Sequence, residues 1–341
     1  MKKLRVVVLM HGALVPPDDV SSVSVDDADW KTEYHVVNNL RLLGHDVLPL
    51  GIAGDLAPIR DAIRDFKPDV AFNLLEAFDD VVTWDQNVVA YLELMKLPYT
   101  GCNSRGLLLG RDKAITKKLL TYHRIRVPDF AIFPLGRAIK RPRRLGFPLI
   151  VKSLIFDASI GISQASLVDS DERLAERVRF IHESLGTDAL AEQYVDGREM
   201  YVGVLGNHRL QALPVWEMSF ADLPEGRPKI ATEHVKSRAA YRKKYAITTG
   251  PAKDLAPEVA QRIQEICKRV YRTLDLSGYA RIDLRLDAAG QPYVLEANPN
   301  PALAADEDFA DSAKLTGLEY GPLLQRIVNL GLDWARRTTE T

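Results

Sequence analysis

The stretch that decides the fold lies near the C-terminal end and reads Arg281-Ile282-Asp283-Leu284-Arg285-Leu286, then Tyr293-Val294-Leu295-Glu296-Ala297-Asn298. Residues 287–290 between the two runs read Asp-Ala-Ala-Gly, which is typical of a hairpin turn. Side chains alternate between the two faces of a strand, so the pattern predicts one apolar and one polar face. We expect the apolar face to hold Ile282, Leu284, Leu286, Tyr293, Leu295 and Ala297. The polar face then holds Arg281, Asp283, Arg285, Glu296 and Asn298, with Val294 as its one apolar member.

The polar face of this hairpin brings two carboxylates, Asp283 and Glu296, within one or two ladder steps of each other. Like charges at such range repel, and a half-buried position adds a desolvation cost. A hard divalent cation with oxygen ligands relieves both effects, and the amide of Asn298 supplies a further oxygen. The pattern alone leaves a second interpretation open, which is a solvated amphipathic hairpin with a charged outer face.

The first hundred residues alternate apolar strands with helices, which predicts a parallel sheet covered by helices. The predicted strands are Arg5–Met10, Asp46–Leu50 and Pro68–Leu75, and the predicted helices are Val25–Leu43, Pro58–Phe66 and Val88–Lys96. Gly44, directly after the first helix, fits a helix C-terminus.

The rest of the chain pairs its strands through short turns. Between residues 105 and 188 we expect a small α+β unit with the helices Asp112–His123 and Glu172–Leu185, the strand Pro148–Ser153 and the loop Ile155–Ser163. From residue 189 we expect an antiparallel sheet with the strands Ala189–Val195, Glu199–Leu205 and Arg209–Trp216, the helix Pro257–Leu274 and the hairpin quoted above. The predicted fold class is therefore α/β, with α+β in the C-terminal part. The predicted domains are residues 1–104, 105–188 and 189–341.

The hairpin closely resembles the metal-binding hairpin of the ATP-grasp superfamily and looks most like that of D-alanine–D-alanine ligases. Further segments resemble this family in the same order along the chain: Leu97–Gly101, Gly110–Lys113 with Lys117, Phe147–Lys152, Ala158–Ser163, and Ala191–Val195 with Gly197 and Glu199. The resemblance implies an ATP-grasp fold in which ATP lies between the central and C-terminal domains. It also implies two Mg²⁺ ions, which Mn²⁺ can replace, held by Asp283, Glu296 and Asn298, and a catalytic Arg281 that steadies an oxyanion.

The same resemblance implies a set of ATP-binding residues. The phosphates are expected against Lys113, Lys152, Ser159, Gly161 and Lys236, and the nucleoside against Glu192, Tyr194, Val195 and Glu199. Taken singly, each of these residues also fits a surface lysine, a surface loop or a strand edge.

The segments that recognise substrate in D-alanine–D-alanine ligases do not match. Where those enzymes read N-x-x-P-G-x-T, this chain reads Asn298-Pro299-Asn300-Pro301-Ala302-Leu303-Ala304. Their histidine–glycine motif after the third strand is replaced by Asn-Leu-Leu-Glu-Ala-Phe at residues 73–78. We therefore expect that joining two molecules of D-alanine is not the main activity, with Glu76 and Asn300 as candidate substrate residues. Glu76 equally fits a helix start, and the acidic residues 306–308 fit either a site for a cationic acceptor or a solvated helix start.

The activity that the resemblance implies is an ATP-dependent carboxylate–amine ligation through an acylphosphate, giving ADP and phosphate. The partners are then a small carboxylic acid and a small amine. Two alternatives stay open, a ligase that modifies a peptide or protein terminus and a non-catalytic ATP-binding regulatory protein. The resemblance also allows a homodimer, for which the sequence contains no motif.

The composition of the chain indicates which partners and which cellular location to expect. The chain has 341 residues, 46% of them hydrophobic, and a net charge of −1, which argues against nucleic acid as a partner. The N-terminal apolar run is too short for a signal-peptide core or a membrane span. Cys102 and Cys267 have neither metal-site nor disulfide spacing, which fits a reducing cytoplasm. We therefore expect a cytoplasmic enzyme without membrane contact.

Overall fold

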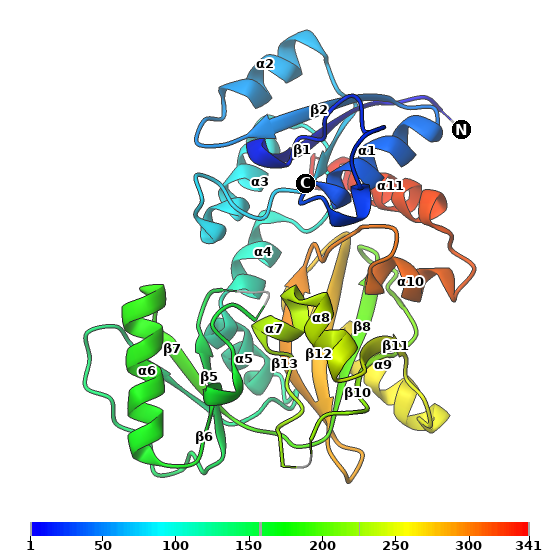
Figure 1. The fold of residues 1–341 in the computed structure, drawn as a ribbon. Coiled ribbons are helices and arrows are strands. Elements are labelled where there is room, and N and C mark those ends of the chain that lie inside the picture. The colour runs from blue at the N-terminus through cyan, green and yellow to red at the C-terminus, as the bar shows by residue number, and fades with distance from the viewer. Residues whose placement is uncertain (1, 157–158, 225, 340–341) are drawn as a thin grey trace.

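A computed structural model describes residues 2–156, 159–224 and 226–339, without the side chains at positions 236, 237, 239 and 337–339. Its N-terminal part contains a parallel sheet of three strands in the order β2-β1-β3 (Figure 1). The bounds are Arg5–His11 for β1, Asp46–Ile52 for β2 and Val70–Asn73 for β3. The residues of β1 from Val6 to Met10 are fully buried because helices and a neighbouring layer cover both faces. The predicted parallel sheet is therefore confirmed.

Three helices accompany this sheet, namely α1 (Lys31–Leu42), α2 (Ala57–Asp65) and α3 (Asp85–Leu94). The prediction that the first helix begins at Val25 is wrong, since residues 25–27 form a separate 3-10 turn. The hydroxyl of Ser24 donates to Asp27 within that turn, and such local bonds compete with helix formation. Gly44 follows the helix with a φ of 87°, a conformation that favours glycine, as the sequence predicts.

The central part is built on a four-stranded antiparallel sheet in the order β4-β7-β5-β6. The strands are β4 (Phe130–Phe133), β5 (Leu149–Ser153), β6 (Leu167–Val168) and β7 (Ala189–Gln193). The helix α6 (Asp171–Leu185) packs Leu174, Val178 and Ile181 against this sheet. Two further helices, α4 (Ser104–Arg111) and α5 (Lys113–Tyr122), connect it to the N-terminal sheet.

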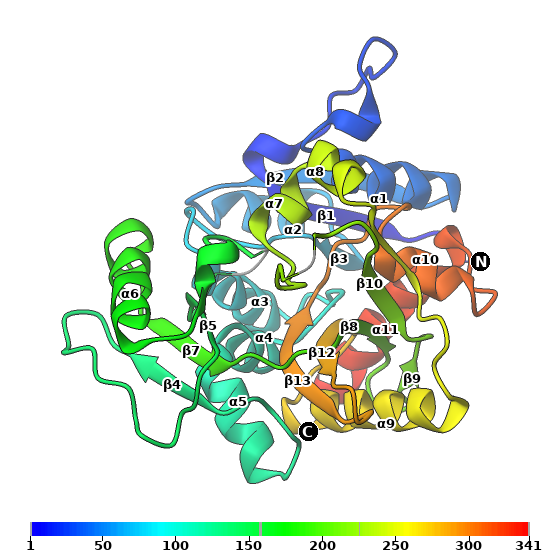
Figure 2. The ribbon, with the colours of Figure 1, turned by 60° about the horizontal axis from the view of Figure 1, so that its bottom comes forward.

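The C-terminal sheet has six strands. They are β8 (Arg198–Leu205), β9 (Gln211–Ala212), β10 (Trp216–Phe220), β11 (Ile247–Pro251), β12 (Tyr279–Leu286) and β13 (Pro292–Pro299). A single strand predicted over Arg209–Trp216 is wrong, because Pro214 has no N–H for the ladder and separates β9 from β10. The helix α9 (Pro257–Thr273) covers one face (Figure 2), and the short helices α7 (Glu233–Ser237) and α8 (Ala239–Lys244) lie over the other.

The last two helices are α10 (Asp308–Lys314) and α11 (Tyr320–Thr339), and α11 packs against the N-terminal part of the chain. The buried residues Leu324, Ile327 and Val328 of α11 belong to one core cluster with Val8 of β1 and Leu40 of α1. This packing explains why the last helix lies beside the first in Figure 1. No helix among the described residues combines the length and the apolar character that a membrane span needs.

Candidate active site

The polar residues of the β12–β13 hairpin form a row across the C-terminal sheet. Asp283 lies directly opposite Glu296, and Arg281 lies opposite Asn298. The neighbouring strand β8 extends the row with Tyr201, which is the partner of Asp283 on the other side. The expected closeness of the two hairpin carboxylates is therefore observed in the strand register.

One part of the predicted face assignment is wrong. The register shifts after Asp283, so that Leu284 lies opposite Val294 and Leu295 is an extra residue. Val294 is consequently buried in the core, with 1% of its surface exposed, whereas Leu295 lines the polar pocket described below. Because of this β-bulge, the residues of β13 that precede it, including Tyr293, occupy the opposite face from the one that regular alternation predicts. Regular alternation along the sequence cannot reveal it.

Arg281 binds the carboxylate of Asp283 through two parallel hydrogen bonds. The distances are 2.7 Å from Nε to Oδ1 and 2.8 Å from Nη2 to Oδ2. Burial by itself lowers the pKa of the Arg281 guanidinium, but the charge of Asp283 outweighs it and raises the pKa above its usual range. The guanidinium also lies 4.9 Å from the centre of the Tyr201 ring. These contacts hold Arg281 in one geometry at the surface of the sheet.

The predicted metal ligands offer two carboxylates, Asp283 and Glu296, and one amide, Asn298. No cluster of three or more Asp, Glu, His or Cys side chains suited to a metal occurs in the part of the chain that the structure describes. The buried Nδ2 of Asn298 has no hydrogen-bond partner among these residues. Because amide oxygen and nitrogen can exchange places by rotation, Asn298 has a polar atom to direct at a bound group. Two carboxylates and an amide suit Mg²⁺, whose remaining ligands are commonly water and phosphate oxygens.

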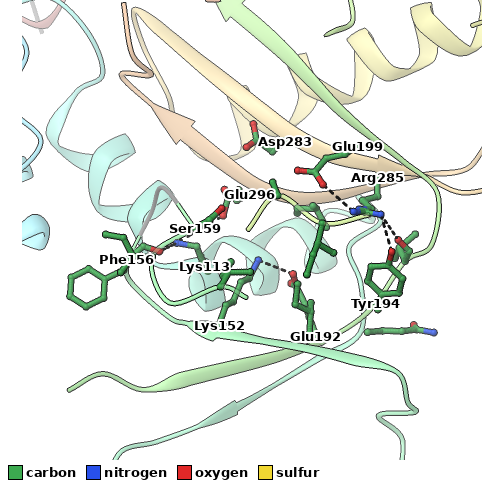
Figure 3. Close-up of a pocket in the computed structure, with 18 residues that line it drawn as sticks. Lys113, Lys152, Phe156, Ser159, Glu192, Tyr194, Glu199, Asp283, Arg285 and Glu296 are labelled. Carbon is green, nitrogen blue, oxygen red and sulfur yellow. Dashed lines mark hydrogen bonds and ion pairs between the residues drawn. The ribbon is translucent and has the colours of Figure 1, made fainter. Parts of the chain in front are cut away.

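A buried ion cluster lies next to the hairpin (Figure 3). The carboxylate of Glu192 is 2.7 Å from Nζ of Lys117. It is also 2.7 Å from Nζ of Lys152, the ion pair that Figure 3 draws. Burial by itself raises the pKa of Glu192, but the two ammonium groups outweigh it and lower the pKa. Burial lowers the pKa of the Lys117 amine. Two cations share one carboxylate here, so the cluster carries a net positive charge.

Lys113 connects this cluster to the hairpin. It lies one helical turn before Lys117 on α5, so both side chains leave the same face of the helix. Its Nζ donates to the carbonyl oxygen of Phe156 at 2.9 Å and lies 3.9 Å from Oε2 of Glu296. A site that places lysines beside two carboxylates is arranged for a ligand that carries negative groups and metal ions together.

The predicted phosphate loop follows β5. Residues 157 and 158 lie outside the described part of the chain, and so does the side chain of Lys236. Ser159 lines the pocket, while the N–H of Gly161 donates to Glu233 of α7 at 2.9 Å, away from it. The carbonyl oxygen of Gly161 accepts from Arg177. The loop is therefore tied to the segment that covers the C-terminal sheet.

Three of the four predicted nucleoside residues, Tyr194, Val195 and Glu199, gather around Arg285, whereas Glu192 lies between Lys117 and Lys152. The sequence places Arg285 on the polar face without a role. Its Nη2 is 3.0 Å from Oε2 of Glu199, and its Nη1 donates to the carbonyl oxygen of Val195 at 3.3 Å. The guanidinium lies 5.2 Å from the centre of the Tyr194 ring (Figure 3). The hydroxyl of Tyr201 donates to the other oxygen of Glu199 at 2.8 Å. Arg285 and Tyr201 are thus site residues that sequence reasoning missed.

A single pocket between the central and C-terminal sheets collects most of the predicted ATP and metal residues. It is lined by Lys113, Lys152, Ser159, Glu192, Tyr194, Val195, Glu199, Asp283, Arg285 and Glu296 together with Gln193 and apolar neighbours. Gly161 and Asn298 are not part of this lining, and the side chain of Lys236 is not described. Its volume is about 80 Å³, well below the roughly 300–1,000 Å³ of typical ligand pockets.

The two candidate substrate residues line a different cleft, between the N-terminal and C-terminal sheets. Glu76 lies there after β3, and Asn300 lies there just beyond β13. Oδ1 of Asn300 accepts from the backbone N–H of Cys102 at 2.8 Å. The side chain of Asn300 therefore joins the two parts of the chain at the base of this cleft.

The acidic run near residue 306 starts α10, which agrees with the helix-start interpretation. Asp306 is 2.5 Å from Nζ of Lys31. Oδ1 of Asp308 accepts from Nε1 of Trp216 at 3.0 Å and from the hydroxyl of Thr249 at 2.6 Å. These two carboxylates are therefore engaged within the protein.

Known proteins are similar to this chain in both sequence and fold. The family described as D-ala D-ala ligase C-terminus matches residues 120–329. A D-alanine–D-alanine ligase of Bordetella petrii is 34% identical over 72% of this chain and 71% of its own length. An uncharacterized protein of Sinorhizobium fredii, y4sG, is 32% identical over 86% of this chain and 85% of its own length.

A solved structure extends the likeness to nearly the whole molecule. The D-alanine–D-alanine ligase of Bacillus anthracis, crystallised in complex with ATP, covers 98% of this chain and 99% of its own. The TM-score is 0.75 at 23% sequence identity, which supports the fold. Together with the family match and the identity to the curated relatives, this shows that the chain belongs to the D-alanine–D-alanine ligase family of ATP-grasp ligases, which form carbon–nitrogen bonds.

Proposed function

We propose that the protein uses ATP to join a small carboxylic acid to a small amine, through an acylphosphate and with release of ADP and phosphate. The observation that carries the proposal is the pocket in which Lys113, Lys152, Asp283 and Glu296 converge. Lysines beside paired carboxylates suit a metal-bound polyphosphate, because the cations neutralise phosphate and the carboxylates hold the metal.

We propose that ATP lies with its phosphates toward Lys113, Lys152, Ser159, Gly161 and Lys236. The nucleoside end then meets Glu192, Tyr194, Val195 and Glu199, with Arg285 held against the last of these at 3.0 Å. Since the pocket measures about 80 Å³, ATP enters only when its lining side chains or the covering loops shift. The bond between Gly161 and Glu233 is a contact that such a shift breaks.

We propose Asp283, Glu296 and Asn298 as the ligands of two Mg²⁺ ions. Magnesium held there would neutralise negative charge on the phosphates of ATP. The opposed register of Asp283 and Glu296 and the unpartnered amide of Asn298 support this assignment.

The reaction places separate demands on the protein. The substrate carboxylate must lie in line with the γ-phosphate, and the protein contributes mainly by positioning the two groups. The acylphosphate then has to be shielded from water, a task for the loop after β5 and for residues 230–246. The amine next attacks the acyl carbon, and a negative oxygen forms. Arg281, at one end of the hairpin row, is assigned to this oxyanion, a contribution of about 3 kcal/mol.

We propose that the substrates are not two molecules of D-alanine. The departures at residues 73–78 and 300–304 support this, since both segments contribute residues to the cleft beside the hairpin. The sequence predicts three domains, at residues 1–104, 105–188 and 189–341. Because β7 pairs with β4 and β5, we propose that the last boundary lies after Gln193 instead.

Magnesium-dependent binding of a non-hydrolysable ATP analogue tests the assignment of the pocket. We expect micromolar binding by calorimetry with Mg²⁺, at least tenfold weaker binding without it, and similar losses for Lys152→Met and Glu296→Ala. Glu172→Gln, an exposed change on α6, serves as the matched control. Binding that ignores both Mg²⁺ and Glu296→Ala would remove the basis of the proposed site.

A further inference from the structure

A further cavity lies beside the phosphate loop and is separate from the nucleotide pocket. It has a volume of about 160 Å³ and is lined by three segments, namely the loop at residues 161–164, the helix α6 and residues 232–241, which include α7. Among the described residues it shares only Ile162 with the nucleotide pocket. A single water molecule needs only about 10–15 Å³, so a small ion fits into this space.

Arg177 of α6 brings a buried positive charge to this cavity. Only 8% of its surface is exposed, and its guanidinium carbon lies 4.2 Å from the centre of the Phe180 ring. Its Nη2 donates to the carbonyl oxygen of Gly161, but its buried Nε has no hydrogen-bond partner among the described residues. Burial lowers the pKa of Arg177, whereas at Arg281 a carboxylate outweighs the same effect. A buried charge of this kind is destabilising unless an anion pairs with it.

Gln164, in the 3-10 turn that follows the loop, brings an unpaired acceptor to the same cavity. Its buried Oε1 has no hydrogen-bond partner among the described residues. Its Nε2 donates to the carbonyl oxygen of Pro228 at 3.5 Å. Rotation of the amide would turn its oxygen toward that carbonyl oxygen, so this contact fixes which of the two amide atoms is unpaired. The cavity thus combines a donor that needs an acceptor with an acceptor that needs a donor.

Glu233, in the first turn of α7, determines which kind of anion suits the cavity. It is the one carboxylate of the lining among the described residues, and its Oε2 accepts from the N–H of Gly161 at 2.9 Å. A fully ionised anion is repelled by this carboxylate, whereas an anion that carries a proton can donate to Gln164 or to Glu233. Inorganic phosphate keeps a proton at neutral pH, and sulfate does not. The lining therefore favours phosphate.

We propose that this cavity is a binding site for a protonated oxyanion, represented by inorganic phosphate, in which Arg177 donates to the oxygens of the ion and Gln164 accepts from its hydroxyl. The inference does not depend on the proposed ligase activity. Neither side chain belongs to the lining of the nucleotide pocket or to the hairpin.

The bound oxyanion joins three segments that surround the phosphate loop. The loop and α7 are already connected, since the N–H of Glu233 donates to the carbonyl oxygen of Ile162 at 3.0 Å. ATP needs a shift of the covering loops to enter its pocket, and an ion that ties the loop to α6 and α7 opposes this shift. Phosphate therefore lowers the affinity for ATP, and by linkage ATP lowers the affinity for phosphate by the same factor. We expect a factor of about five to ten.

Calorimetric titration with sodium phosphate and with sodium sulfate, at pH 7 and constant ionic strength, tests the site. We expect phosphate to bind with a dissociation constant on the order of 1 mM or below, and sulfate to bind about tenfold more weakly or not at all. Arg177→Met should abolish the binding of phosphate, and Gln164→Met should remove the preference for phosphate over sulfate. Arg173→Met changes an exposed arginine one turn earlier on α6 and should bind phosphate like the wild type.

Titration with the non-hydrolysable ATP analogue at rising phosphate concentrations shows whether the two sites are separate. In the wild type the dissociation constant of the analogue should rise about five- to tenfold and then level off, because coupling between separate sites is limited. In Arg177→Met it should stay constant. A rise that continues in proportion to phosphate means direct competition in the nucleotide pocket and overturns the inference. Phosphate binding through Arg177 in a protein that binds no analogue refutes the proposed function alone.

The melting temperature separates a lost binding site from a misfolded variant. Without phosphate, Arg177→Met should melt at or above the temperature of the wild type, because the change removes an unpaired buried charge. Gln164→Met changes an uncharged side chain outside α6 and provides the test through a second variant. Three further outcomes overturn the inference: the wild type binds no phosphate, it binds sulfate as tightly as phosphate, or Lys152→Met in the nucleotide pocket abolishes phosphate binding while Arg177→Met retains it.

Discussion

Replacing Glu192 by glutamine should destabilise the protein more than any comparable surface change. Glu192 lies between Lys117 and Lys152, and both contacts measure 2.7 Å. The Lys117 side chain is 0% exposed, that of Lys152 is 8% exposed and that of Glu192 is 3% exposed. Glutamine keeps the shape but removes the charge, so two buried ammonium groups lose the carboxylate that both of them contact.

The burial of these three side chains determines how much unfolding free energy the Glu192→Gln variant should lose. Removing one partner of a buried ion pair costs about 3–5 kcal/mol, because the remaining charge is left uncompensated. An exposed pair contributes only about 0–1 kcal/mol. Asp169 and Arg173 on the surface, 3.4 Å apart, supply the matched control through Asp169→Asn. We therefore expect a loss of about 3–5 kcal/mol for Glu192→Gln and less than about 1 kcal/mol for the control.

Urea unfolding at pH 7 measures both changes, with equal m-values as the condition for comparing free energies. The double variant Glu192→Gln/Lys152→Met should lose less than the sum of the single variants, by roughly 0.5–3 kcal/mol. Because the pKa of Glu192 is lowered from 4.5, its contribution is present above that pH and disappears as the pH falls through the folded-state value. A loss below about 1 kcal/mol, or strict additivity, would refute the reasoning.

Three further predictions concern the pocket, the hairpin and the cysteines. Arg285→Met should raise the dissociation constant for the ATP analogue by about tenfold with an unchanged circular dichroism spectrum, because it removes the cationic partner of Glu199. Unchanged affinity would exclude a role of Arg285 in nucleotide binding. Val294→Thr should cost about 1–3 kcal/mol of unfolding free energy and Leu295→Thr less, and the reverse order would contradict the bulge. Burial raises the pKa of the Cys102 thiol to about 12, and Cys267 is buried as well. Ellman's reagent should therefore report no thiol in the native protein and two thiols after unfolding. Rapid labelling of the native protein would disprove that burial.

The sequence was informative where local pattern and tertiary structure agree. The hairpin carboxylates could be paired from alternation alone, because Asp283 and Glu296 face each other before the register shifts. Val294 could not be placed, since the extra residue depends on how β13 packs against its neighbours rather than on its own composition. The helix α4 was missed because its two glycines lower helix propensity. Gly110 is nevertheless needed there, because a Cβ atom at this position would lie only 3.0 Å from the ring of Pro299.

The roles of charged residues were hardest to predict where they depend on contacts between distant parts of the chain. Arg285 stood on the polar face of the hairpin, but its link to Glu199 requires β8 and β12 to be neighbours. Glu33 lies on an ordinary amphipathic helix, and only the fold reveals that it faces a cleft instead of solvent. Lys117 repeats Lys113 one turn later, which predicts a shared helix face but not which carboxylate each lysine approaches.

The central claim, ligation driven by ATP, is tested most directly by ADP release with Mg²⁺-ATP and every pairing of a panel of amino acids, hydroxy acids and simple carboxylic acids with a set of amino acids and simple amines. The wild type is compared with Glu296→Ala, Asp283→Asn and the control Glu172→Gln. The account predicts ADP release that requires both an acid and an amine, stays unchanged in the control and falls at least a hundredfold in both hairpin variants. Equal release without either substrate, or full activity in Glu296→Ala, would contradict it.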